Sequence, residues 1–131
     1  MAFNAKRNDP AKFTEGAWVE IMGGRFKVAR AGNSTYESAL ERSGYRRAVG
    51  PDEKEQTLMR ALAEGILKDW DDVVDANDKP IKYSVEAATA VLEENPDLMT
   101  RILAEAQRME NFRRDDISDQ AEKQSAGSGS S

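Results

Sequence analysis

The chain has 131 residues, of which 39% are hydrophobic and 33% are charged, and its net charge is −5. This length fits a single domain with a small core and a heavily solvated surface. Cysteine and histidine are both absent, which excludes disulfides, thiolate catalysis, the Ser-His-Asp arrangement and most zinc sites. No run approaches the roughly 20 apolar residues of a membrane span. We therefore expect a non-catalytic protein of the cytoplasm.

Charge is unevenly distributed along the chain. Residues 1–47 carry nine Lys/Arg against five Asp/Glu, whereas residues 48–131 carry ten against nineteen. A basic head and an acidic body can steer a partner or a neighbouring copy. Solubility alone is the alternative explanation.

The N-terminal 30 residues predict an arm followed by a β-hairpin. Residues 1–16 are polar apart from isolated phenylalanines, and we expect a loose arm. Gly23-Gly24 is the predicted two-residue turn, because glycine tolerates the positive φ of favoured hairpin turns. One hairpin face, formed by Val19, Ile21, Phe26 and Val28, is then apolar and has to pack on the helices. The expected cross-strand pairs are Met22–Arg25, Ile21–Phe26, Glu20–Lys27 and Val19–Val28.

Two helices are predicted next. Ser34 and Glu37 form a capping box that starts a helix extending to about Arg47. Pro51 suits a first helical position, and apolar residues at four-residue steps predict a helix over residues 52–69.

Two further helices follow an acidic turn. The second predicted helix ends next to Trp70, and Ser84 caps the third. Asn95 caps the fourth and Pro96 opens it, with an end near Phe112. The apolar stripe of this last helix consists of Leu98, Met99, Ile102, Leu103, Ala106 and Met109.

These elements predict an α+β fold that is mainly helical, with an N-terminal β-hairpin packed on a body of about four helices. Residues 17–114 form the single domain. Residues 115–131 end in SAGSGSS, which has the composition of a flexible linker, and we expect them to form a disordered polar tail.

The acidic turn between residues 69 and 78 does not match a calcium loop. Counting from Asp75, the fifth position is Lys79 and the sixth is Pro80, where a calcium loop needs an oxygen ligand and a glycine. The glycines match no nucleotide-binding loop either. We therefore expect no metal and no cofactor.

Binding to another protein is the expected activity. Trp70, Ile81 and Tyr83 surround the acidic turn where two helical units meet, so they are candidates for a partner groove. Met99 and Leu103 add apolar surface from the last helix, which can pack on one side and self-associate on another. The alternative for each of these side chains is burial in the core.

A basic surface on the N-terminal half offers a different partner. Its cations can neutralise phosphates while Trp18 and Tyr45 stack on bases, although the acidic body argues against nucleic acid. The cations are Arg25, Lys27, Arg30, Arg42, Arg46 and Arg47.

Residues 16–112 resemble the tail assembly chaperones of long-tailed bacteriophages. The similarity lies in a helix ending near a tryptophan, the segment WDDVVDANDKPIKYS, an alanine-rich helix, ENPDL and a final helix. The segment GAWVEIMGGRFKVARAGNSTYESAL is compatible with family members that have an N-terminal hairpin.

The resemblance implies a protein that keeps the hydrophobic helices of the tape-measure protein soluble in the cytoplasm of the infected bacterial host. Tail-tube protein polymerises around the tape measure meanwhile, and a longer, frameshifted form of such chaperones can contact it. The resemblance also implies a homo-oligomer. The alternatives are a nucleic-acid-binding accessory protein and a structural tail or head–tail joining subunit.

Overall fold

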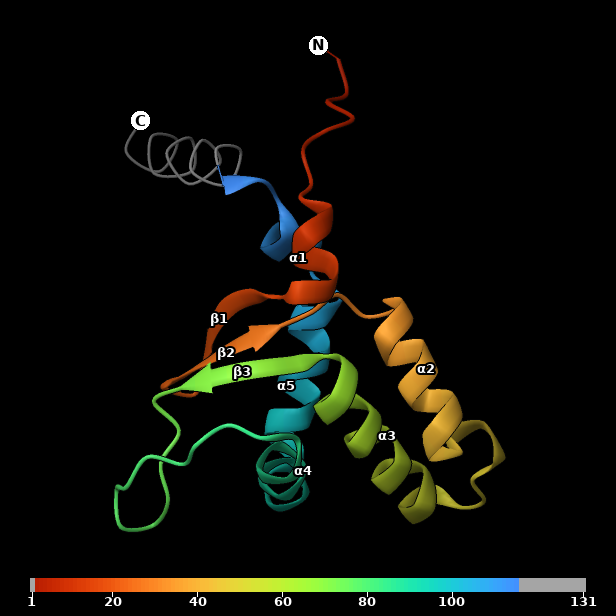
Figure 1. Ribbon diagram of the computed structural model, residues 1–131, viewed down its shortest axis with the longest axis vertical. Coiled ribbons are helices and arrows are strands. Elements are labelled where there is room, and N and C mark those ends of the chain that lie inside the picture. Colours follow the sequence, from red (N-terminus) through yellow and green to blue (C-terminus); the bar gives the residue numbers. More distant parts are fainter. Residues whose placement is uncertain (1, 116–131) are drawn as a thin grey trace.

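The computed structural model describes residues 2–115 and confirms the expected α+β, mainly helical fold. A three-stranded antiparallel sheet of order β1-β2-β3 lies beside five α-helices in this part of the chain (Figure 1). The strands are β1 (Ala17–Ile21), β2 (Gly24–Val28) and β3 (Leu67–Asp71). The helices are α1 (Pro10–Glu15), α2 (Ser34–Ser43), α3 (Pro51–Gly65), α4 (Val85–Glu94) and α5 (Pro96–Ala106), with 3-10 turns η1 (Tyr45–Arg47) and η2 (Met109–Phe112).

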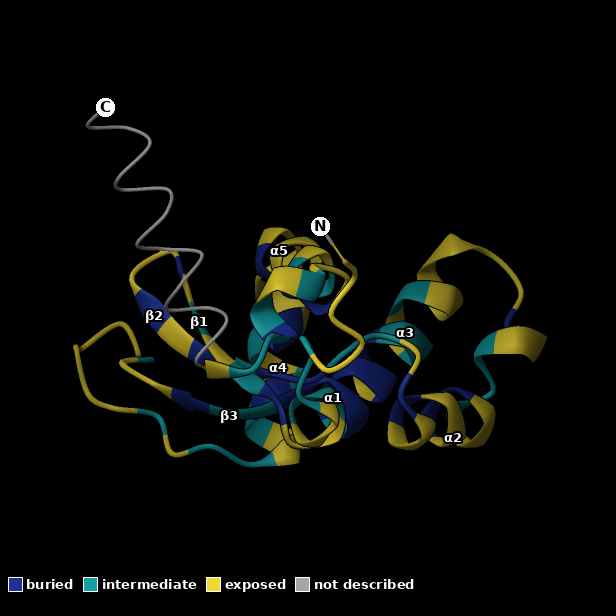
Figure 2. Ribbon diagram, turned by 90° about the horizontal axis from the view of Figure 1, so that it is seen from above, coloured by how far each residue is buried: buried dark blue, intermediate teal, exposed yellow. Residues whose placement is uncertain are grey.

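The core lies between the inner face of the sheet and the helices. Helix α5 packs against β1 and β2, and α4 packs against both α3 and α5. The α2–α3 pair lies on the other side of α5 from the sheet (Figures 1 and 2). The largest fully buried side chains are Ile21, Val28, Leu62, Ile66, Leu67, Leu92, Ile102 and Phe112.

The hairpin turn differs from the sequence expectation by one residue. Its central residues are Met22 and Gly23, with φ of 51° and 86°, so the turn predicted at Gly23-Gly24 is wrong. Gly24 is needed for packing instead, because a Cβ there would lie 2.9 Å from the Phe26 ring. Observed pairs are Ala17–Val28, Trp18–Lys27, Val19–Phe26, Glu20–Arg25 and Ile21–Gly24.

The apolar face nevertheless has the expected members. Each residue of β1 pairs two positions away from its predicted partner, and a shift of two leaves every side chain on its own face. Phe26 and Ile21 are therefore buried, while Glu20 and Arg25 face outward.

The sequence does not predict strand β3, because its pattern places residues 67–69 in a helix that ends next to Trp70. Helix α3 instead ends at Gly65, and Trp70 pairs with Phe26 on β2. An irregularity in the β2–β3 ladder lies where Val28 pairs with Leu67 and the neighbouring Lys27 pairs with Asp69. This bulge lets Leu67 and Trp70, three residues apart, both point into the core. A spacing of three residues is also that of apolar residues on one face of a helix, which is why the sequence favours a helix here.

Asn33, not Ser34, caps α2. Its side-chain oxygen accepts from the Tyr36 backbone N–H at 2.9 Å, and its amide donates to the Gly65 carbonyl at 3.1 Å. The helix ends at Ser43, before Arg47, because Gly44 adopts a left-handed conformation.

The later helix starts follow the sequence more closely. Ser84 caps α4 by accepting from the Ala87 N–H at 3.0 Å, and Pro51 and Pro96 open their helices as expected. The side chain of Asn95 does not cap α5, because its amide donates to the Val91 carbonyl of α4 at 2.8 Å.

Part of the expected loose arm is ordered by the other end of the chain. Asp9 caps α1, and its own N–H donates to the Phe112 carbonyl at 2.8 Å. Phe13 meets Phe112 edge-to-face with ring centroids 6.0 Å apart. Of the polar tail predicted over residues 115–131, all but Asp115 lies outside the described residues.

Gly65→Ala should destabilise the fold although alanine favours a helix. An added Cβ would lie 2.4 Å from the Tyr36 Cα, so α2 and α3 would have to separate. Overpacking of this kind costs about 1–3 kcal/mol. Urea unfolding followed by circular dichroism measures it, with Ser38→Ala on the exposed face of α2 as the control. An unchanged or higher midpoint for Gly65→Ala would contradict the close contact.

Candidate partner-binding groove

The structure brings Trp70, Ile81 and Tyr83 together. The Trp70 indole N–H donates to the Ile81 carbonyl at 2.7 Å, and its ring meets Tyr83 edge-to-face with centroids 5.3 Å apart. The Tyr83 hydroxyl donates to the Leu67 carbonyl at 2.5 Å. Both aromatic side chains thus use their polar atoms inside the fold, and Trp70 is only 7% exposed. These two side chains therefore support the wall of the candidate site, and they offer little accessible surface of their own.

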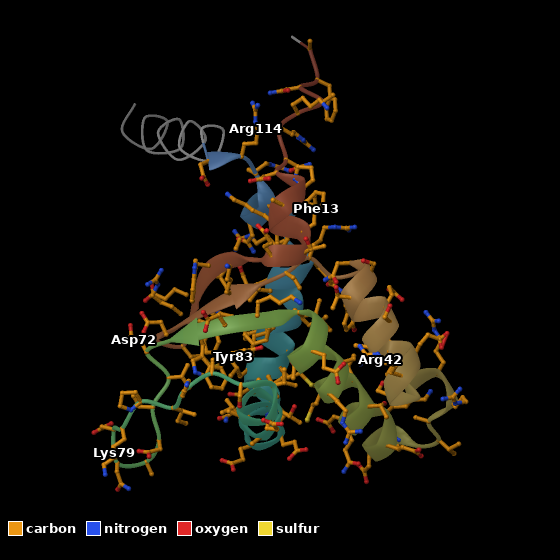
Figure 3. The ribbon with its side chains drawn as sticks, viewed as in Figure 1. Phe13, Arg42, Asp72, Lys79, Tyr83 and Arg114 are labelled. Atoms are coloured by element: carbon orange, nitrogen blue, oxygen red, sulfur yellow. The ribbon has the colours of Figure 1, made fainter. Side chains whose placement is uncertain are left out.

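The segment between Trp70 and Tyr83 forms a small hairpin that projects from the sheet (Figure 3). The Ile81 N–H donates to the Val73 carbonyl at 2.9 Å, and the Asp75 N–H donates to the Lys79 carbonyl at 2.9 Å. One carboxylate oxygen of Asp75 accepts from the N–H groups of Asn77 and Lys79. Asp75 therefore organises the acidic turn. Among residues 2–115 no carboxylate cluster is placed to hold a metal ion.

An open groove of about 610 Å³ lies between this segment, the β1–β2 turn and helices α4 and α5. Pockets of this size take small ligands or the side chains of a partner. Its apolar lining includes Ile21, Met22, Phe26, Val74, Ala90 and Val91. Its charged lining consists of Asp72, Asp75 and Glu94. We call it the α4 groove.

A second groove, of about 460 Å³, lies along β3 and the returning segment. Trp70 and Tyr83 line it, and Ile81 lines both grooves. Its charges are mixed, since Lys68 and Lys82 stand beside aspartates. Burial lowers the pKa of Lys68.

Met99 and Leu103 are not part of either groove. Both are half-buried on α5 and pack against the core beside Ile102. Of the five candidate residues, three therefore lie together, and only Ile81 reaches the α4 groove.

Sequence reasoning missed the exposed apolar residues of the α4 groove. Met22 is 58% exposed and Val74 is 48% exposed, and both line the same groove. Apolar residues that gather in one patch mark an interaction site, whereas single exposed ones do not. A methionine before Gly23, at a position where hairpin turns prefer asparagine or glycine, was the one available signal.

Backbone strain accompanies this groove. Met22 and Asp72 both line it and both adopt left-handed backbone conformations, with φ of 51° and 57°. Such conformations cost an ordinary side chain about 1–2 kcal/mol, although aspartate tolerates them better than methionine. The fold therefore keeps Met22 at a position that a polar residue would occupy more stably.

Ion pairs offset part of the expected basic surface. Arg42 pairs with Glu64 at 3.1 Å. Arg46 contacts Glu37 and Glu41, and Arg25 lies 3.6 Å from Asp71. Three of the six cations proposed for nucleic acid thus face carboxylates, which weakens the attraction for phosphates.

Comparison with known proteins places the chain among phage-derived proteins. The model of the family described as YdaY prophage protein matches residues 26–123. The chain belongs to this family. Searches of curated proteins and of solved structures found no match. Within the described residues, no helix is long and apolar enough to cross a membrane.

Tyr83→Phe should lower the free energy of unfolding by about 1 kcal/mol at neutral pH, because the hydrogen bond to the Leu67 carbonyl is lost. Burial, and then the negative charge of Asp69, raise the pKa of Tyr83 above its ordinary value of 10.0. Stability held by the neutral phenol is therefore complete below pH 10 and lost as the pH rises through the raised pKa. Thermal melts above pH 10 should fall more steeply for the wild type than for Tyr83→Phe. Parallel pH profiles would contradict this role.

Proposed function

We propose that this protein is a tail assembly chaperone that binds the tape-measure protein in the cytoplasm of the infected bacterial host, without catalysing a reaction. The observation that supports the proposal is the α4 groove, whose apolar lining the protein's own side chains leave open. Self-association, and contact with tail-tube protein through a longer form, belong to the same proposal.

The groove suits an amphipathic helix. A helical client inserts apolar residues spaced three or four positions apart into a hydrophobic groove, and this mode requires no catalytic group. Val91 and Ala87 lie four residues apart on α4 and offer a helical surface along one wall. On the opposite wall, the hydrogen bond from Trp70 to the Ile81 carbonyl holds the returning segment in place.

Phage origin supports the proposal from a separate direction. The family match covers α2 through α5, and therefore the groove walls built from the 72–81 segment, α4 and the start of α5. A prophage protein with an unfilled apolar groove fits a role in which hydrophobic client helices are kept apart until assembly.

Ala90→Arg should block client binding. Ala90 is exposed and lines the groove on α4, and arginine is a good helix former that can pair with Glu86 and Glu94 one turn away. We expect at least about a tenfold loss of affinity for the tape-measure protein of the same phage, because the arginine side chain would occupy the space that the client needs. A tenfold loss corresponds to about 1.4 kcal/mol of binding free energy. The measurement is co-expression followed by affinity purification and titration of the captured segment.

Ala104→Arg is the matched control, because Ala104 is an exposed alanine on α5 outside both grooves. It should capture the client as the wild type does. Tape-measure protein that stays insoluble with wild-type protein would overturn the proposal. Recovery of the protein in purified virions would favour the structural-subunit alternative instead.

Met22→Asn should stabilise the hairpin and weaken the capture of client. Asparagine tolerates the left-handed conformation, so the free energy of unfolding should rise by up to about 1 kcal/mol. The groove meanwhile loses a flexible apolar contact. Thermal melts and client titration measure the two effects side by side.

Asp78→Gly serves as the comparison for Met22→Asn. Asp78 also has a left-handed backbone, with φ of 62°, but lines neither groove. Its replacement should relieve strain without affecting capture. Client binding that survives Met22→Asn unchanged would remove Met22 from the site.

A further inference from the structure

The charged residues that line the α4 groove all have the same sign. Asp72, Asp75 and Glu94 are exposed, and over residues 2–115 none of them forms an ion pair. Asp72 also lines the second groove, where Lys68 and Lys82 accompany the aspartates, whereas Asp75 and Glu94 line the α4 groove and not the second. Among the described residues that line the α4 groove there is no lysine or arginine, so its lining carries only negative charge.

These carboxylates stand on both sides of the groove. Asp72 and Asp75 follow β3 on the projecting segment, and Glu94 ends α4 on the other wall. Figure 3 shows Asp72 at the end of β3, where the projecting segment begins. A helix lying in the groove would therefore meet a carboxylate along each flank.

We propose that the α4 groove selects helical segments whose apolar ridge is flanked by lysine or arginine. The inference rests on the proposed function and names the kind of client segment that the groove takes. Apolar contact gives affinity without regard to charge, whereas rim carboxylates attract cationic flanks and repel acidic ones. The preference is electrostatic and therefore weakens as salt screens exposed charges.

The test uses two peptides derived from one captured tape-measure segment. One keeps or gains Lys/Arg on the flanks of its apolar ridge, and the other carries Glu at the same positions. Fluorescence anisotropy at low and high salt measures the affinity of the full-length protein for each peptide. We expect the basic peptide to bind at least about fivefold tighter at low salt, a ratio typical of a few exposed charge pairs. The ratio should shrink at high salt.

A charge variant then assigns the preference to the groove. Asp72→Asn with Glu94→Gln removes two rim carboxylates and leaves Asp75 to hold the acidic turn. Its ratio of affinities should fall toward one. The control, Glu15→Gln with Glu20→Gln, removes the same charge from exposed residues of α1 and β1 that line neither groove, and should keep the wild-type ratio.

The outcomes separate this inference from the function on which it rests. Equal binding of both peptides by the wild type would overturn the charge preference and leave the chaperone role standing. Failure to bind any tape-measure segment would overturn both. A third outcome is that the wild type forms dimers that Ala90→Arg abolishes and that neither peptide displaces. The groove would then bind a second copy of this chain, and the inference would be overturned.

Discussion

The hydrogen bond from the Trp70 indole to the Ile81 carbonyl controls the geometry of the whole groove. It joins the last strand of the sheet to the segment that leads into α4. Two further bonds act with it, from the Ile81 N–H to the Val73 carbonyl and from the Tyr83 hydroxyl to the Leu67 carbonyl. Together they fix residues 72–80 and the start of α4 relative to the sheet. The Trp70 bond also satisfies the polar atom of a buried ring, which a folded protein requires. The bond from Trp70 to Ile81 thus contributes both to the core and to the shape of the groove.

The aromatic residues and the open surface of the groove have different roles, because the rings pack inside the fold and smaller side chains form the accessible lining. Trp70 and Tyr83 are packed against each other and hydrogen-bonded to backbone carbonyls. The open surface comes from smaller or flexible side chains such as Met22, Val74 and Ala90. Large rings make strong anchors only when a partner can reach them, and here the fold has already used them. Flexible aliphatic contacts can adapt to varied partner surfaces, which suits the chaperone role that we propose.

Sequence patterns predicted the parts of the fold that local chemistry decides. Ser84, Pro51 and Pro96 lie at helix starts because caps and fixed φ act within a few residues. Strand β3 escaped prediction because a bulge put Leu67 and Trp70 at a helical spacing. The choice of Asn33 over Ser34 as the cap escaped prediction, because both residue types suit a helix start and only Asn33 also donates to Gly65, which is distant in sequence.

The sequence predicted which residues of the candidate site lie close together, but it did not predict which of them remain accessible. The sequence indicated that Trp70, Ile81 and Tyr83 meet, because they bracket one turn, and the structure brings them together. The open wall depends on how the β1–β2 turn approaches α4, which is a long-range contact. No local pattern encodes that distance. Met99 and Leu103 illustrate the converse, since an apolar helical stripe does not tell which of its residues stay accessible.

Pairing between the two ends of the described chain has a consequence for anything attached to them. Asn8 bridges to Arg113, and the Arg114 N–H donates to the Arg7 carbonyl at 2.9 Å. Both ends therefore leave at one pole of the molecule, and the projecting 72–81 segment lies toward the opposite pole (Figure 1). An extension or fusion beyond residue 115 starts away from the α4 groove. Two proteins of different length that share this domain can therefore present the same groove. They would differ only in the segment that is attached at the opposite pole.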